Sequence, residues 1–293
     1  MSFNSIENYF AQFPDDIESI GVPIQTHYLP NLSRFYKLRE LQCIYNKLTQ
    51  LPTLPATLEY LSCCHNQLTQ LPTLPRTLKM LYCSNNQLTQ LPTLPPTLTM
   101  LLCCYNQLKQ MPNLQPTLTD LFCYNNQLSQ LHSLPLTLKY LVCCNNQLKQ
   151  LPTLPPTLLH LYCINNLLTQ LPTLPSILTH LVCNNNQLTQ LPTLPSILIH
   201  LDCRNNLLPF DHERKDPNMM EYIIQMRNKK NIFIRFKELF YALKYKKQFR
   251  DWLWVNIREP KIRNKYHPDN LIKLLEHREN LTLDELDELH DNW

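Results

Sequence analysis

Residues 58–68 read LEYLSCCHNQL, and residues 78–88 read LKMLYCSNNQL. Both follow the frame L-x-x-L-x-C-x-x-N-x-L, which returns every 20 residues without insertion from Leu38 to Leu208. A fixed period of this length is typical of a solenoid, in which each copy forms one coil and is stabilised by the coils beside it. Nine copies in one register therefore predict a repeat protein.

Alternation inside the frame predicts one short strand in each copy. Around Leu61 and Cys63 the apolar side chains occupy alternate positions, so both are expected to point inward. Asn66 follows where the chain turns away, and its amide can bond the backbones of neighbouring copies. The return at residues 51–55, LPTLP, suits an extended polyproline conformation, because proline has no N–H to place in a ladder.

The frame resembles that of the leucine-rich-repeat family, with cysteine in a slot where leucine or valine is usual. The remainder of each copy, such as LPTLPATLEY at residues 51–60, resembles the short LP-x-LP class of bacterial type III secreted effectors. The all-cysteine form with NNQL is similar to repeat proteins of giant amoeba viruses of the mimivirus type. The resemblance implies an α/β solenoid, a leucine-rich-repeat horseshoe with a parallel concave β-sheet and an extended or polyproline convex side.

The limits of the frame divide the chain into three segments. Residues 38–208 hold the nine repeats. Residues 1–37 are expected to form an N-terminal helical cap, in which Ser5 or Asn4 begins a short helix and Pro14 ends it.

Residues 209–293 lose the frame, and their apolar spacing predicts a small α-helical C-terminal domain. Residues 227–265 contain 13 basic and 3 acidic residues, a net charge of +10, so this segment could contact nucleic acid. Residues 266–293 contain 2 basic and 8 acidic residues, which favours charge pairing inside the domain over nucleic-acid binding. The triplet at residues 267–269, HPD, resembles the loop of J-domain cochaperones, but Pro260 interrupts the basic helix that this family needs.

The composition excludes several classes of protein. The single glycine, Gly21, leaves no residue for a P-loop or a G-x-G-x-x-G turn, which removes the commonest nucleotide-binding enzymes. We expect no enzyme activity, no cofactor and no small-molecule substrate, because no catalytic set of residues is found. We expect neither a signal peptide nor a membrane span, because the opening residues MSFNSIENYF lack a basic start with an apolar run and no stretch of 18 apolar residues occurs. The 12 cysteines are then expected to be reduced in the cytoplasm, or in the host cytoplasm or virion if the protein is viral.

The cysteine spacing favours core packing over zinc or disulfide chemistry. The nine frame cysteines share an inward apolar column, where cysteine behaves as a small hydrophobic residue. Three more, Cys64, Cys104 and Cys144, point outward and stand two repeats apart, about 10 Å, which is too far for a bridge or a shared metal. No cysteine follows Cys203, so the ubiquitin-ligase activity of some type III effectors is not transferred to this chain.

Strand alternation also assigns an outward face, which is rich in aromatic residues and poor in charge. Such a surface suits protein binding, although repeat drift on an unused face would give a similar composition. The partner-binding residues predicted on it are Tyr60, Tyr82, Leu102, Phe122, Tyr124, Tyr140, His160, Tyr162, His180 and His200.

Three of these residues, His160, His180 and His200, fall in one column and are expected to stack. A metal site is an alternative, but parallel side chains in a ladder do not converge on one point. The column therefore predicts a polar patch whose affinity for a partner changes near pH 6.

These observations predict a non-enzymatic scaffold that binds a protein on its concave face. An adaptor is the alternative, in which the cap or the helical tail recruits host ubiquitin-ligase or chaperone machinery.

Overall fold

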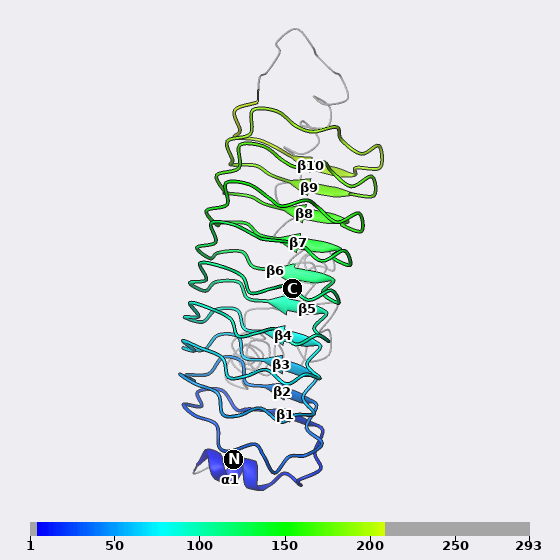
Figure 1. The fold of residues 1–293 in the computed structure, drawn as a ribbon. Coiled ribbons are helices and arrows are strands. Elements are labelled where there is room, and N and C mark those ends of the chain that lie inside the picture. Colours follow the sequence, from blue (N-terminus) through cyan, green and yellow to red (C-terminus); the bar gives the residue numbers. More distant parts are fainter. Residues whose placement is uncertain (1–4, 209–293) are drawn as a thin grey trace, which may run out of the picture. The chain divides into compact units, whose positions relative to one another are not determined.

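The computed structural model describes residues 5–208, which form one helix and ten strands (Figure 1). The helix α1 spans Ile6–Ala11. The strands are β1 (Ser19–Gly21), β2 (Glu40–Gln42), β3 (Tyr60–Ser62), β4 (Met80–Tyr82), β5 (Met100–Leu102), β6 (Asp120–Phe122), β7 (Tyr140–Val142), β8 (His160–Tyr162), β9 (His180–Val182) and β10 (His200–Asp202). They make a single parallel sheet in sequence order, so each coil lies between its sequence neighbours.

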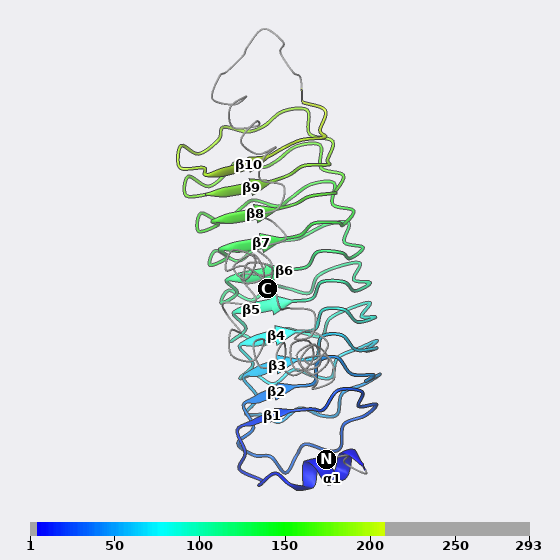
Figure 2. The same ribbon diagram turned by 180° about the vertical axis from the view of Figure 1, so that it is seen from behind.

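The strand pairing repeats the sequence frame. Leu41 pairs with Leu61 and Leu61 with Leu81, and the same step of 20 residues continues to the last pair of strands. Figures 1 and 2 show the coils stacked with all strands on one side and the proline-rich returns on the other. The predicted solenoid with a parallel sheet is therefore confirmed, whereas horseshoe curvature stays a prediction.

The interior is built from identical columns. Leu61, Cys63 and Leu68 are fully buried, as are their equivalents in most coils, and leucines of the return such as Leu71 are nearly so. Between the described strands the chain forms turns and extended segments, and the only helix in residues 5–208 is α1. The inward placement predicted for the leucines and the frame cysteines is thus correct.

A buried asparagine ties each coil to the one before it. The Nδ2 of Asn126 donates to the carbonyls of Cys103 and Cys123, at 3.0 and 3.1 Å, and its Oδ1 accepts the N–H of Leu108 at 3.0 Å. One side chain therefore satisfies backbone groups of two coils that would otherwise be buried without partners.

The N-terminal end contains the expected helix and an additional strand. Ser5 caps α1 by accepting the N–H of Asn8 at 3.2 Å, and the last residue of α1 precedes Pro14 by three positions. Beyond it, β1 pairs with β2 and buries Ile20 and Val22. The sequence frame did not predict β1, because these two residues replace the usual leucine and cysteine.

Several sequence predictions lie outside the described residues. These are the helical C-terminal domain at residues 209–293, the nucleic-acid segment at 227–265 and the HPD triplet at 267–269. In residues 5–208 no helix has the length and apolar character needed to cross a bilayer.

Candidate functional site

The candidate site is the outward side of the sheet, which we name the strand face. It consists of the two outer residues of each strand from β2 to β10 together with the second residue after the strand. All ten predicted partner-binding residues lie on it, but Tyr82 and Leu102 are buried, each with 5% of its surface exposed. The other eight are half-buried, so this face is more tightly packed than we expected.

One part of the strand face is a tyrosine–methionine cluster on β3 to β5. The rings of Tyr60 and Tyr82 meet edge to face with centroids 5.2 Å apart. The Tyr82 hydroxyl lies 2.9 Å from the sulfur of Met100 and 3.9 Å from that of Met80. These contacts place a polarisable, apolar surface over three successive coils.

A second part is a histidine stack on β7 to β10. Ring centroids are 4.5 Å apart between Tyr140 and His160, 4.4 Å between His160 and His180, and 5.8 Å between His180 and His200. The ring planes of each pair are within 23° of parallel. The predicted stacking of the three histidines is therefore present in the structure.

A threonine hydroxyl holds the ring of His180. The Nδ1 of His180 lies 2.9 Å from the Thr179 hydroxyl, which in turn lies 3.0 Å from the Leu159 carbonyl. The same carbonyl accepts the backbone N–H of Thr179 at 2.9 Å. These contacts orient the ring of His180 within the stack.

Burial changes the titration of the histidine stack. It lowers the pKa of His160 to about 4, with a further contribution from His180, and it lowers the pKa of His180 as well. The His160 ring is therefore neutral at pH 6, so a change in affinity that depends on this ring is expected at a lower pH than 6.

The described histidines and cysteines form no metal site. Within residues 5–208 no three His, Cys, Asp or Glu side chains are grouped so that they could hold an ion. The rings of His160 and His180 lie parallel and one above the other, so their nitrogens do not meet at a common point.

The cysteines are all free thiols. Burial raises the pKa of the frame cysteines, and Cys103 lies 3.5 Å from the carbonyl of Phe122 in the next coil. Among the outward cysteines Cys64 is half-buried, whereas Cys104 and Cys144 are buried. Burial raises the pKa of the last two to about 12, so their thiolate forms are rare at neutral pH.

Two features of the site were missed by sequence reasoning. The residue before each buried asparagine has a positive φ, 54° at Asn125 and 52° at Asn145. Asparagine tolerates this conformation better than most residues, so its frequency there was a usable signal in a chain with one glycine. Exposed asparagines of this column also bond one another, since Asn145 donates to Asn125 at 2.6 Å.

The last two described coils carry an ion pair and an unsatisfied acceptor. Arg204 forms an ion pair with Asp202 at 2.6 Å. Burial opposes ionisation of Asp202, but the hydrogen bonds from Arg204 outweigh it and lower the pKa of the carboxyl group. One coil earlier, the buried Oδ1 of Asn184 has no hydrogen-bond partner in the described part of the chain.

Comparisons with known proteins identify the repeat. A family model for leucine-rich repeats, in two copies, matches residues 56–96. No similar sequence is found among curated proteins.

Three of the solved structures with similar coils are bacterial proteins. YopM from Yersinia enterocolitica is 26% identical over 68% of this chain and 57% of its own, with a TM-score of 0.45. A Shigella effector domain is 28% identical over 63% and 74%, with a TM-score of 0.41. InlJ from Listeria monocytogenes, whose functional domain includes a cysteine ladder, is 23% identical over 66% and 54%, with a TM-score of 0.48.

This chain thus spans 57% of the length of YopM. The likeness to giant-virus proteins stays a prediction. The family model identifies leucine-rich repeats at residues 56–96, and the uninterrupted 20-residue frame and the stacked parallel strands continue the same solenoid coil over residues 38–208.

Proposed function

We propose that this chain is a non-enzymatic scaffold that binds a protein partner on the strand face. The observation that carries the proposal is a difference between two sets of surface positions in the same repeats. On the proline-rich side, the position of Gln50 is glutamine in all eight coils from Gln50 to Gln190, and every copy is exposed. The position of Thr53 is similarly uniform, with threonine in six of eight coils.

The strand face differs sharply from that side. The position of Glu40 holds five residue types in nine coils, and the position of Gln42 holds seven. Exposed glutamines have little packing to preserve, so drift alone should have varied them at least as much as the half-buried strand face. The strand face varies while this exposed glutamine column does not, which favours selection for a specific surface over drift on an unused one.

The chemistry of the strand face also fits a protein partner. It combines stacked aromatic rings, thioethers and few charges, the composition found at the centres of protein interfaces. Because all 12 cysteines are free thiols, we place this function in a reducing compartment such as the cytoplasm.

Site-specific photo-crosslinking in the full chain tests the proposal. A photoreactive residue at position 122 or 162 should crosslink to one recurrent protein in the native cell, whereas the same residue at Gln150 or Gln170 should not. Alanine at Phe122, Tyr162 and His180 together should reduce capture of that protein by at least about tenfold. Equal crosslinking from both sides of the solenoid would contradict the proposal.

An adaptor role would require a second surface outside the strand face. It depends on the cap or on residues 209–293, and no contact in residues 5–208 supports it over the simpler scaffold. It stays a prediction, to be tested by crosslinking from those segments.

A further inference from the structure

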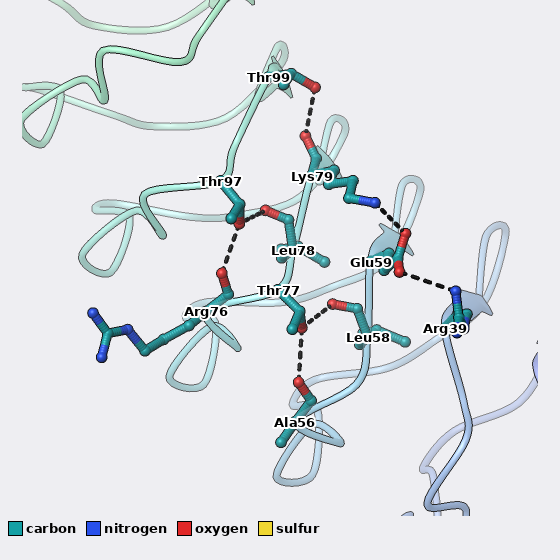
Figure 3. A network of polar contacts seen from close by, with 10 residues as sticks. All are labelled: Arg39, Ala56, Leu58, Glu59, Arg76, Thr77, Leu78, Lys79, Thr97 and Thr99. Carbon is teal, nitrogen blue, oxygen red and sulfur yellow. Dashed lines mark hydrogen bonds and ion pairs between the residues drawn. The ribbon is translucent and has the colours of Figure 1, made fainter.

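A column of threonines closes the edge where the chain enters each strand. The equivalent position is threonine in six successive coils, namely Thr57, Thr77, Thr97, Thr117, Thr137 and Thr157. The hydroxyl of Thr97 lies 2.6 Å from the carbonyl of Arg76 and 2.8 Å from that of Leu78, both in the preceding coil (Figure 3). The column thus serves the fold by satisfying carbonyls between coils.

The last two described coils lack this threonine. Ile177 and Ile197 replace the threonines, with 38% and 48% of their surfaces exposed. Isoleucine has no hydroxyl that could donate to the carbonyls of the preceding coil. Its side chain is exposed, so it adds little hydrophobic stabilisation. These substitutions therefore weaken the packing scheme of the repeat, and we look to function for their cause.

Other exposed apolar residues lie on the same edge. Leu136 is 72% exposed and Ile199 is 66% exposed, two positions beyond Ile197. A backbone ladder holds this edge together, since Leu159 donates to Lys139 at 2.9 Å, Thr179 donates to Leu159 at 2.9 Å and Ile199 donates to Thr179 at 2.8 Å. Ile177, Ile197 and Ile199 consequently lie in two adjacent coils, and Leu136 lies two coils before Ile177 on the same edge.

The edge is also basic. We name it the strand-entry edge, and it comprises the positions equivalent to residues 56, 57 and 59 together with Arg39. Its charged residues are Lys37, Arg39, Glu59, Arg76, Lys79 and Lys139, a net charge of +4, and Lys37 pairs with Asp16 at 3.3 Å.

Ion pairing leaves two of these cations available. Arg39 and Lys79 hold Glu59 between them, at 3.4 and 2.6 Å (Figure 3). Arg76 and Lys139 have no ion pair within residues 5–208.

We propose that the strand-entry edge binds an acidic, amphipathic segment of the protein partner. The apolar side chains of that segment would cover Leu136, Ile177, Ile197 and Ile199, and its carboxylates would face Lys139 and Arg76. The proposal rests on the proposed function and extends the interface from the strand face around the adjoining edge. Charge complementarity selects an acidic occupant over a basic or neutral one.

A labelled peptide measures this binding directly. The probe is a synthetic helical peptide with leucines on one face and glutamates on the other, and its counterpart has lysine in place of every glutamate. Fluorescence anisotropy with the full chain should show binding of the acidic peptide at least about tenfold tighter than that of the basic one, and the difference should fall as salt rises.

Three variants locate the contact. Ile177→Thr with Ile197→Thr restores the residue of the other coils, so it should preserve the fold while weakening peptide binding about tenfold or more. Lys139→Glu should weaken binding severalfold, whereas Gln150→Glu on the proline-rich side, the control, should leave it unchanged. Absent binding, equal binding of both peptides, or binding that the edge variants do not change would overturn the proposal.

Two further outcomes separate this proposal from its alternatives. Sedimentation that shows self-association, lost in the double threonine variant, would make a second copy the occupant and overturn the acidic segment. If peptide binding fails while crosslinking at positions 122 and 162 still captures a partner, then the strand face functions without the edge and only this proposal is wrong.

Discussion

The inward and outward positions of the same strand differ in how much their residues vary from coil to coil. In β8, Leu161 faces inward between identical leucines of the neighbouring coils, whereas His160 and Tyr162 face outward. The inward columns contain one residue type because each side chain packs on copies of itself, and a change in one coil leaves a cavity or a clash in two interfaces. The outward columns are not constrained in this way, because their side chains are partly exposed to solvent. The comparison teaches that the interior columns specify the fold, which leaves the residues of the strand face available for a binding surface.

The largest expected effect comes from ionising the interior. Eight frame cysteines from Cys43 to Cys183 are fully buried, and burial raises the pKa of each thiol above its ordinary value of 9.0. Above pH 9 the unfolded chain loses these protons while the folded chain retains them, so stability falls as pH rises. At about 1.4 kcal/mol per cysteine by pH 10, the loss is about 11 kcal/mol, similar to the whole stability of many domains.

Circular dichroism during an alkaline titration measures this loss. We expect cooperative unfolding with a midpoint near pH 10, and native thiols that resist alkylation at pH 8. A native spectrum at pH 12 would show that the cysteine column does not control alkaline stability.

The next effect contrasts two adjacent asparagines. Asn126→Ala should destabilise the solenoid by about 3 kcal/mol or more, because it removes a buried donor and acceptor that join two coils. Asn125→Gly, at the half-buried position one residue earlier, keeps the positive φ accessible and removes only the hydrogen bond from Asn145, so it should cost about 1 kcal/mol or less. Urea unfolding of both variants checks the contrast, and similar losses would refute the division into interior and surface roles.

A smaller effect belongs to the histidine stack. The pKa of His160 is lowered to about 4, so the contribution of this ring is present above pH 6.5 and is lost as pH falls toward 4. Allowing for its partial exposure, we expect a loss of roughly 1–2 kcal/mol between pH 7 and pH 4. The free energy of unfolding of the wild type and of His160→Gln, each measured at pH 7 and pH 4, isolates the contribution of this ring. NMR titration of His160 should give a midpoint below pH 5. A midpoint near 6.5 would mean that the ring is solvated.

The smallest effect concerns the strand-entry edge. Thr97→Val should cost about 1 kcal/mol, since it removes the hydroxyl that lies between two carbonyls of the preceding coil. The reverse exchange, Ile177→Thr, should raise the unfolding midpoint slightly. If Ile177→Thr instead destabilises the chain, the isoleucine serves the fold and the functional argument for the edge weakens.

Sequence reasoning predicted the fold better than the site. The period of 20 residues fixed the strand positions, because in-register stacking permits only one alignment of Leu61 with Leu81. It did not predict β1, in which Ile20 and Val22 carry the pattern without its residue types. The burial of Tyr82 and the lowered pKa of His160 depend on neighbours in other coils, which a single repeat does not display. Binding by the ten predicted residues stays a prediction.

The order of the strands has a mechanical consequence. Because β1 to β10 lie in sequence order, no strand fastens one end of the sheet to the other. Tension applied to the two ends should then detach coils singly from an end, and each step would release 20 residues, about 65–70 Å of extended chain. A force trace would show even steps, and the coil with the weakest interface would set where peeling begins.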